Sequence, residues 1–225
     1  SLVSDLSHDG KIVEIGAGDG VLLSIVRRRR QDVQLVGVDI AFSASTRKRL
    51  SELGIETITD AIDSVDDVCL SPGSTDLVIM NQSIEHLWEP QRVLKIIKRT
   101  LKDHGRVVVS TPDYDGYDRK VWQHYWGGWY APRHLNLFTR SEMIELFREA
   151  GLELVQVRGL VAPVIWCHSL GSYFSNRRSG SHVAKYFFKA PILALAIFSI
   201  VDLFAKTVGL ETSNAEYVFV KKTLR

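Results

Sequence analysis

The chain has 225 residues, of which 45% are hydrophobic and 24% charged, as in ordinary globular proteins. These proportions exclude a disordered tail, a collagen-like fibre and a disulfide-rich scaffold. With 28 basic and 26 acidic residues the formal charge is +2, so the overall charge predicts no nucleic-acid partner, and a local basic patch is the alternative.

Alternating strands and helices are predicted over the first 110 residues. Short β-branched runs predict strands, and amphipathic runs predict helices. We expect strands at 11–15, 33–39, 55–58, 75–80 and 106–110, helices at 21–30, 43–53 and 90–101, and a turn at Asp103-His104-Gly105. This alternation is typical of an α/β protein whose parallel sheet is covered by helices on both faces.

The second half of the chain is less regular. Residues 113–137 are rich in aromatic residues and glycine, which predicts a long loop. A helix at 141–150 and a strand at 152–158 follow, then a mostly helical insertion at 159–213 and a last strand at 216–222. No repeat or linker marks a second domain, so we expect one domain over 1–225.

Targeting signals are not evident. The first ten residues lack the basic and apolar regions of a signal peptide, and they include no initiator Met, which leaves open whether residues precede them. The longest apolar run, 190–201, is shorter than the roughly 20 residues of a membrane-spanning helix. Cys69 and Cys167 are the only cysteines and form no Cys-x-x-Cys pair, which favours a reducing, cytoplasmic location and no metal site.

The most informative stretch is the glycine-rich turn at 14–20, between the first strand and the first helix. Glycines allow positive φ angles and let a ligand lie against bare backbone, and a helix N-terminus offers N–H donors. The spacing is Gly-x-Gly-x-Gly, which differs from the Gly-x-Gly-x-x-Gly of dinucleotide sites. A tight turn with no ligand is the alternative.

Acidic residues follow the next two strands. Asp39 lies about 20 residues beyond the glycines, where a carboxylate accepts hydrogen bonds from both hydroxyls of an adenosine ribose. Asp60 is placed to accept from an adenine amino group while Ile40 and Ala61 flank the ring. A solvated turn residue is the alternative for Asp60.

Taken together and in order, these motifs resemble class I S-adenosylmethionine-dependent methyltransferases, and in particular the ubiquinone-biosynthesis-type small-molecule enzymes. The matching stretches are 14–20, 38–39, 60–61, 76–81, 83–87 with Pro90, 105–112 and 134–139. The resemblance implies a doubly wound, mostly parallel, seven-stranded Rossmann-like sheet with an antiparallel last strand. It also implies a core of 1–158 and 215–225 and a helical insertion, 159–214, that caps the acceptor site.

The same resemblance implies a site for S-adenosylmethionine. Glu14 would orient the loop or the ammonium group, Asp39 would bind the ribose, and Asn81 would lie near the methionine moiety and the transferring methyl. The full set of implied cofactor-binding residues is Glu14, Gly16, Ala17, Gly18, Gly20, Asp39, Ile40, Asp60, Ala61 and Asn81.

Acceptor handling is less specified. His86 and His134 are candidate bases because histidine titrates near neutral pH, and a structural role is the alternative for each. Trp126, Trp129 and Tyr130 are candidate walls of an acceptor site under a loop hinged at 127–128, and simple anchoring of that loop is the alternative.

Two basic segments need an interpretation. The arginine run 27–30 ends a helix and is typical of a solvated face that complements the helix dipole, with a site for an anionic partner as the alternative. Residues 182–206 mix lysines, aromatic residues and the apolar run, which indicates either a buried helix or a peripheral membrane contact.

We therefore expect an S-adenosylmethionine-dependent methyltransferase that acts on a small-molecule or lipid-linked acceptor, with oxygen favoured by the family resemblance alone. The alternatives are a nicotinamide-dependent oxidoreductase and a non-catalytic protein that binds S-adenosylmethionine. No metal and no oligomeric state are predicted.

Overall fold

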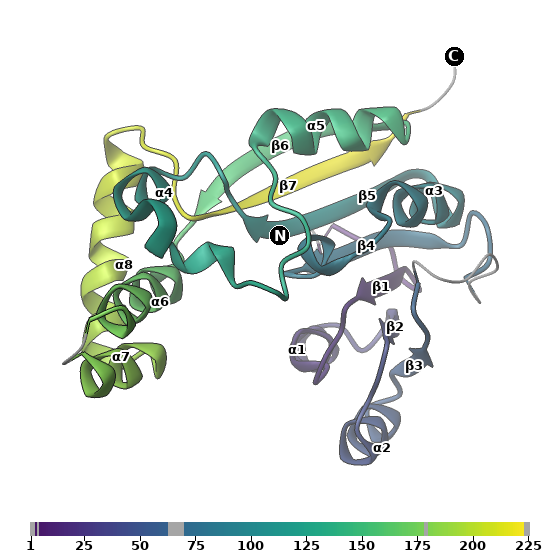
Figure 1. Ribbon diagram of the computed structural model, residues 1–225. Coiled ribbons are helices and arrows are strands. Elements are labelled where there is room, and N and C mark those ends of the chain that lie inside the picture. Colours follow the sequence, from purple (N-terminus) through teal and green to yellow (C-terminus); the bar gives the residue numbers. More distant parts are fainter. Residues whose placement is uncertain (1–2, 4, 63–69, 178–179, 223–225) are drawn as a thin grey trace. The chain divides into compact units, whose positions relative to one another are not determined.

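A seven-stranded sheet forms the centre of the computed structural model, which describes residues 3, 5–62, 70–177 and 180–222 and so leaves Cys69 outside the described residues. The strands are β1 (Lys11–Ile15), β2 (Gln34–Asp39), β3 (Glu56–Thr59), β4 (Thr75–Asn81), β5 (Leu101–Pro112), β6 (Leu152–Leu160) and β7 (Asn214–Lys221). Their order in the sheet is β3-β2-β1-β4-β5-β7-β6 (Figure 1).

Pairing along the sheet is parallel from β3 to β5, with Val13 opposite Val36 of β2 and Val78 of β4. Strand β7 enters between β5 and β6 as the antiparallel strand. The predicted mostly parallel α/β fold with an antiparallel last strand is therefore confirmed. The chain direction also brings the carboxyl ends of β1, β2 and β4 to one edge, where parallel sheets bind ligands.

Helices connect and extend the strands. They are α1 (Val21–Arg29), α2 (Ala44–Glu52), α3 (Pro90–Thr100), α4 (Tyr117–Trp122), α5 (Arg140–Glu149), α6 (Pro163–Ser175), α7 (Ser181–Phe188) and α8 (Ile192–Thr207), with short 3₁₀ turns at Ile84–His86, Gln123–Tyr125 and Gly127–Trp129. Local interactions explain where α2 and α3 begin. Ser43 caps α2 by accepting a hydrogen bond from the Thr46 N–H, and Pro90 stands in the first turn of α3.

Two compact units divide the chain. Unit 1 comprises Ser1–Ser110, Ile144–Gln156 and Tyr217–Arg225, and unit 2 comprises Thr111–Met143 and Val157–Glu216. In unit 1, Ile12, Leu35 and Leu77 of the sheet pack with Leu23 of α1 and Leu50 of α2 in a continuous apolar core. This core holds the ends of β1 and β2 in place.

Two predictions about local structure are wrong. The expected turn at Asp103-His104-Gly105 lies inside β5, where His104 has a φ of +68° and the pairing register with β4 shifts. A β-bulge accommodates such turn-forming residues without ending a strand. The expected loop at 113–137 contains α4 and two 3₁₀ turns, because its aromatic residues pack against one another rather than against solvent.

Two of the four arginines at the end of α1, Arg27 and Arg30, have a structural role. Arg27 donates to the carbonyls of Gln31 and Val33 at 3.0 Å, and Arg30 pairs with Asp32 at 2.7 Å. Arg28 and Arg29 are exposed. The predicted solvated face therefore applies to these two middle arginines.

Candidate functional site

The glycine-rich turn between β1 and α1 is held by the backbone of β2. The N–H groups of Gly16 and Ala17 donate to the Val38 carbonyl at 2.9 and 3.2 Å, and the Gly20 N–H donates to the Ala17 carbonyl at 2.7 Å. Gly20 caps α1 in the left-handed conformation, with φ +65°. The turn is thus fixed at the carboxyl end of two adjacent strands.

The three glycines of this turn meet different surroundings. A Cβ on Gly16 would lie 2.5 Å from the Cβ of Ser83, and one on Gly20 would lie 2.7 Å from the Leu50 side chain. Gly18, with φ +52°, faces open space instead. Gly16 and Gly20 are therefore needed for packing, whereas Gly18 leaves room for a bound molecule.

Asp39 closes one side of this space from the end of β2. Its carboxylate accepts from the Gly18 N–H at 2.7 Å and from the Ala41 N–H at 3.2 Å. The Asp60 N–H donates to the Asp39 carbonyl at 2.9 Å, which brings the second predicted acid beside the first. Ile40 is strongly exposed between them and offers an apolar surface.

Glu14 stands near the end of β1, just before the turn, and is 3% exposed. Burial, and then the negative charge of Asp39, raise the pKa of Glu14 to about 8. Its Oε2 atom has no hydrogen-bond partner among the described residues. A buried carboxyl with an unused oxygen, next to a turn that faces open space, is suited to a cationic ligand group.

We expect stability to fall between pH 4.5 and 8 because of Glu14. Its folded-state pKa of about 8 lies above the ordinary value of 4.5, so the folded chain holds the extra proton and loses stability as the pH rises through this range. Glu14→Gln removes the buried charge and should raise the melting temperature at pH 8 by about 4–8 °C, with little change at pH 5.

Thermal unfolding followed by circular dichroism at the two pH values measures this difference. The matched control is Glu52→Gln, since Glu52 is an exposed residue on α2. Equal melting temperatures for the parent chain and Glu14→Gln at pH 8 would contradict the assignment.

Two polar residues, Asn81 and Ser83, stand at the end of β4 and just after it. The Ser110 hydroxyl donates to Asn81 Oδ1 at 2.6 Å, which orients the Asn81 amide at the end of β4. Ser83 is buried against Gly16, and its hydroxyl has no hydrogen-bond partner among the described residues. Sequence reasoning missed Ser83, because only folding brings it to Gly16.

The two candidate bases differ in their surroundings. His86 ends the 3₁₀ turn Ile84–His86 and is exposed. His134 is half-buried, and its Nδ1 lies 2.7 Å from the Gly128 carbonyl oxygen. A carbonyl only accepts, so Nδ1 donates the hydrogen, and Nε2 is then the atom of the neutral ring that can accept a proton.

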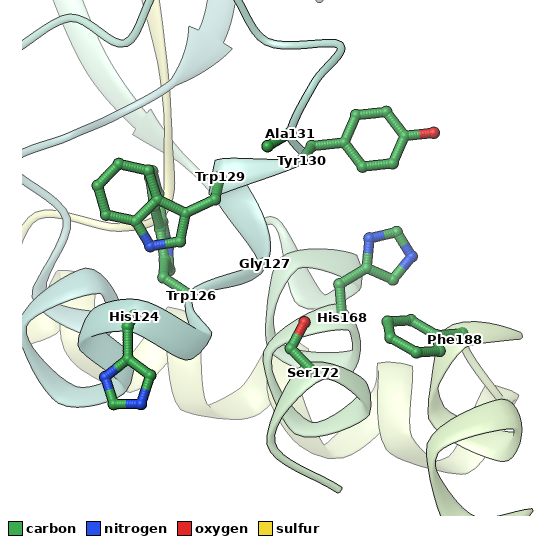
Figure 2. Close-up of a pocket in the computed structure, with 9 residues that line it drawn as sticks. All are labelled: His124, Trp126, Gly127, Trp129, Tyr130, Ala131, His168, Ser172 and Phe188. Atoms are coloured by element: carbon green, nitrogen blue, oxygen red, sulfur yellow. The ribbon is translucent and has the colours of Figure 1, made fainter. Parts of the chain in front are cut away.

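Unit 2 contains a cavity of about 610 Å³. Figure 2 shows Tyr130 over the His168 ring on one side, and Trp129 with His124 on the other. The residues that line it are His124, Trp126, Gly127, Trp129, Tyr130, Ala131, His168, Ser172 and Phe188. All three predicted aromatic wall residues are therefore among its lining.

These three aromatic side chains are not equivalent. Trp126 is 1% exposed, and its Nε1 donates to the buried Asp118 carboxylate at 2.6 Å. Trp129 is half-buried, whereas Tyr130 is 44% exposed, with its ring stacked 6.4 Å from that of His168. Trp126 anchors the loop, and Tyr130 presents the most accessible aromatic surface.

Gly127 and Gly128 allow this loop to pack closely. A Cβ on Gly127 would lie 2.4 Å from the Ile165 carbonyl oxygen, and one on Gly128 would lie 2.3 Å from the Trp126 ring. Close approach explains both glycines without a hinge. Movement of the loop as a lid stays a prediction.

Helices α6 and α7 of the predicted insertion contribute to the cavity, but sequence reasoning did not assign His168, Ser172 or Phe188 to it. His168 and Ser172 are four residues apart on α6 and so lie on one helical face. Burial lowers the pKa of His168, which favours its neutral form. The adjacent Cys167 is fully buried, so the two side chains point to different surroundings.

Comparison with known proteins identifies a family for more than half of the chain. Residues 2–157 match a family model described as a methyltransferase domain. The chain is 28% identical over 158 residues to the ubiquinone biosynthesis O-methyltransferase of Cupriavidus pinatubonensis. That alignment covers 67% of this chain and 63% of the relative, so the chain spans less than two thirds of the relative's length.

Solved structures share the fold at low identity. A phosphoethanolamine N-methyltransferase from Haemonchus contortus, in complex with S-adenosylmethionine, superimposes with a TM-score of 0.62 at 16% identity, over 98% of this chain and 50% of that one. A 1,6-didemethyltoxoflavin N1-methyltransferase from Burkholderia thailandensis gives 0.60 at 15% identity, over 99% and 75%.

Proposed function

We propose that this chain methylates an oxygen of a small-molecule or lipid-linked acceptor. The chain belongs to the methyltransferase-domain family and is a class I S-adenosylmethionine-dependent methyltransferase. In this proposal unit 1 binds the donor, and unit 2 carries groups that bind the acceptor. The observation that carries it is the buried Glu14 carboxyl with its unpartnered oxygen, on the strand that leads into the turn where Gly18 faces open space.

The groups around the glycine turn fit the donor. S-adenosylmethionine has an ammonium group, a ribose diol and an adenine ring. The unpartnered Oε2 of Glu14 suits the cation, the Asp39 carboxylate suits the diol, and exposed Ile40 suits a flat ring. The space at Gly18 would admit the donor against the backbone.

When bound, the donor supplies a methyl group on a positively charged sulfur. The residues of the chain then have two tasks, to align the reacting groups and to take up the proton of the acceptor hydroxyl. Asn81, oriented by Ser110, would position the donor, and alignment of this kind supplies much of the acceleration. His134 would accept the proton at Nε2, since its Nδ1 is bound to the Gly128 carbonyl.

Oxygen as the methylated atom is supported by the name of the ubiquinone biosynthesis relative. The structural neighbours include N-methyltransferases, and the shared fold does not distinguish between the two reactions. The cavity in unit 2 supports an acceptor with a flat ring, because Tyr130, Trp129 and Phe188 offer aromatic surfaces. The insertion 159–214 contributes α6 and α7 to that cavity and is proposed to be the acceptor-site cap.

Donor binding is tested by calorimetry. Asp39→Asn keeps the shape of the side chain but removes its charge, so the hydrogen bonds to a ribose diol weaken. We expect the dissociation constants of S-adenosylmethionine and its demethylated product to rise about 30- to 100-fold, equivalent to about 2–3 kcal/mol. The matched control is Asp9→Asn at an exposed position, where affinity should not change.

The same titrations separate the alternative functions. Binding of NAD in place of S-adenosylmethionine would favour the oxidoreductase. A methyl-transfer screen with labelled donor against phenols, free and lipid-linked, separates an enzyme from a protein that only binds the donor. Donor binding without transfer to any acceptor would support the non-catalytic alternative.

A further inference from the structure

Helix α8 has its apolar side facing outward. Six of its large aliphatic and aromatic side chains are between 51% and 86% exposed, and they recur at helical spacing along one face: Ile192, Leu193, Ile197, Ile200, Leu203 and Phe204. The buried residues of α8 are Ala194, Asp202 and Ala205. An ordinary surface helix shows the reverse arrangement, with its apolar stripe toward the core.

The orientation of α8 follows from specific contacts on its buried side. The Asp202 carboxylate accepts from Trp166 Nε1 at 2.9 Å and from the Ala162 N–H at 2.7 Å. The Trp166 ring also stacks on Phe198 of α8, with centroids 5.4 Å apart. Because these contacts hold the side of α8 that carries Asp202 and Phe198 against α6, the side with the large exposed apolar residues is left outward, and Figure 1 shows α6, α7 and α8 as one helical group.

Positive charge accompanies this apolar face. In the stretch 180–208 the lysines are Lys185, Lys189 and Lys206, and all three are exposed. The one acidic residue of that stretch is Asp202, which is buried and bonded to Trp166. Apolar residues beside exposed lysines are complementary to an anionic lipid surface.

We propose that the apolar face of α8, with Lys185, Lys189 and Lys206, docks the protein on anionic membranes, with α8 lying in the plane of the interface. Its aliphatic side chains and Phe204 enter the boundary of the acyl chains, and the lysines contact lipid headgroups. Binding of this kind adds apolar burial to electrostatic attraction.

An in-plane position agrees with the lengths and angles of these helices. Among the described residues no single helix is long and apolar enough to cross a membrane, although α7 and α8 together meet that test with a 69° bend between them. A crossing by α8 would also separate Asp202 from Trp166 and Ala162. The in-plane position keeps these contacts.

A second copy of the chain is a poorer occupant of this face. A two-fold interface joins the same patch of both chains, so the lysines of the two copies would approach one another.

The position of the cavity also favours a lipid surface over a second copy as the partner of this face, an argument that rests on the proposed function. Phe188 lines the cavity and is partly exposed four residues before α8 begins, so a lipid-linked acceptor would reach the cavity from the docked face.

The test is co-sedimentation of the intact chain with vesicles of equal phosphatidylglycerol and phosphatidylcholine, compared with phosphatidylcholine alone. We expect binding to the anionic vesicles and at least about tenfold weaker partitioning for the double variant Ile200→Glu/Phe204→Glu. The matched control is Val121→Glu/Val155→Glu, at positions of similar exposure outside α8, and it should bind as the parent chain does.

A charge series completes the test. Lys185→Glu/Lys189→Glu should weaken binding to anionic vesicles, whereas Lys48→Glu/Lys95→Glu, at exposed positions on α2 and α3, should not. Equal vesicle binding by the parent chain and the α8 variant would overturn the proposal, as would a dimer that this variant dissociates in the absence of vesicle binding. Calorimetry with S-adenosylmethionine on the same variants separates this outcome from a failure of the proposed function.

Discussion

Replacing His134 by Asn should lower the rate of methyl transfer about 100-fold or more, without changing the dissociation constant of S-adenosylmethionine. The expected size is that of a lost general base. The reason is the hydrogen bond between His134 Nδ1 and the Gly128 carbonyl, which places the ring hydrogen on Nδ1. Nε2 is then the nitrogen that takes up the proton of the substrate hydroxyl. The measurement is single-turnover transfer to a phenol that the intact chain methylates.

The pH profile distinguishes a base from a structural residue. A phenol ionises with a pKa of about 10. The rate of His134→Asn should therefore rise about tenfold per pH unit between pH 7 and 9, because hydroxide replaces the missing base. The other candidate, His86, is compared through His86→Asn. A full rate in His134→Asn, or a loss confined to His86→Asn, would remove His134 from the mechanism.

Replacing Gly18 by Ala should weaken donor binding about 100-fold while the chain still folds. The added Cβ meets nothing within 4 Å in the protein, so it would project into the space proposed for the donor. Loss of the close approach between ligand and backbone at this position reduces affinity directly. Calorimetry with the donor and its demethylated product measures the change.

Gly54 offers a closely matched control. It has a φ of +65° against +52° for Gly18, and a Cβ there also meets nothing within 4 Å. Gly54→Ala should therefore carry the same backbone cost of about 1–2 kcal/mol and bind the donor normally. Equal donor affinity in the Gly18 and Gly54 variants would contradict the proposed placement of the donor. By contrast, Gly16→Ala should reduce stability itself, because its Cβ would overlap Ser83.

Much of the fold follows from local sequence. The limits of β1 agree with prediction, and α1, α2 and α3 agree within about two residues, because β-branched runs, caps and Pro90 act over a few neighbouring positions. The family resemblance rests on motifs at the ends of successive strands, and the family match over 2–157 confirms it. Strand ends are predictable in space as well, since parallel strands bring them to one edge.

The residues of the candidate donor site were proposed from the sequence, but their surroundings were not. Spacing pointed to Gly18 and Asp39, and the family resemblance to Glu14, without indicating which glycine faces open space or that burial raises the pKa of Glu14 to about 8. Both properties depend on neighbours distant in sequence, such as Ser83 against Gly16. The antiparallel last strand was expected from the family resemblance and not from a local pattern, and its position between β5 and β6 was not predicted.

Local patterns therefore established the class of protein, the strand–helix order and the residues around the glycine turn. Packing established the cavity of unit 2 and the outward apolar face of α8. The physical reason is the separation in sequence over which each kind of interaction acts. Helix caps, turns and motif spacing act between close neighbours, whereas the direction of a helix face depends on contacts such as Asp202 with Trp166, 36 residues apart, which form only when the chain folds.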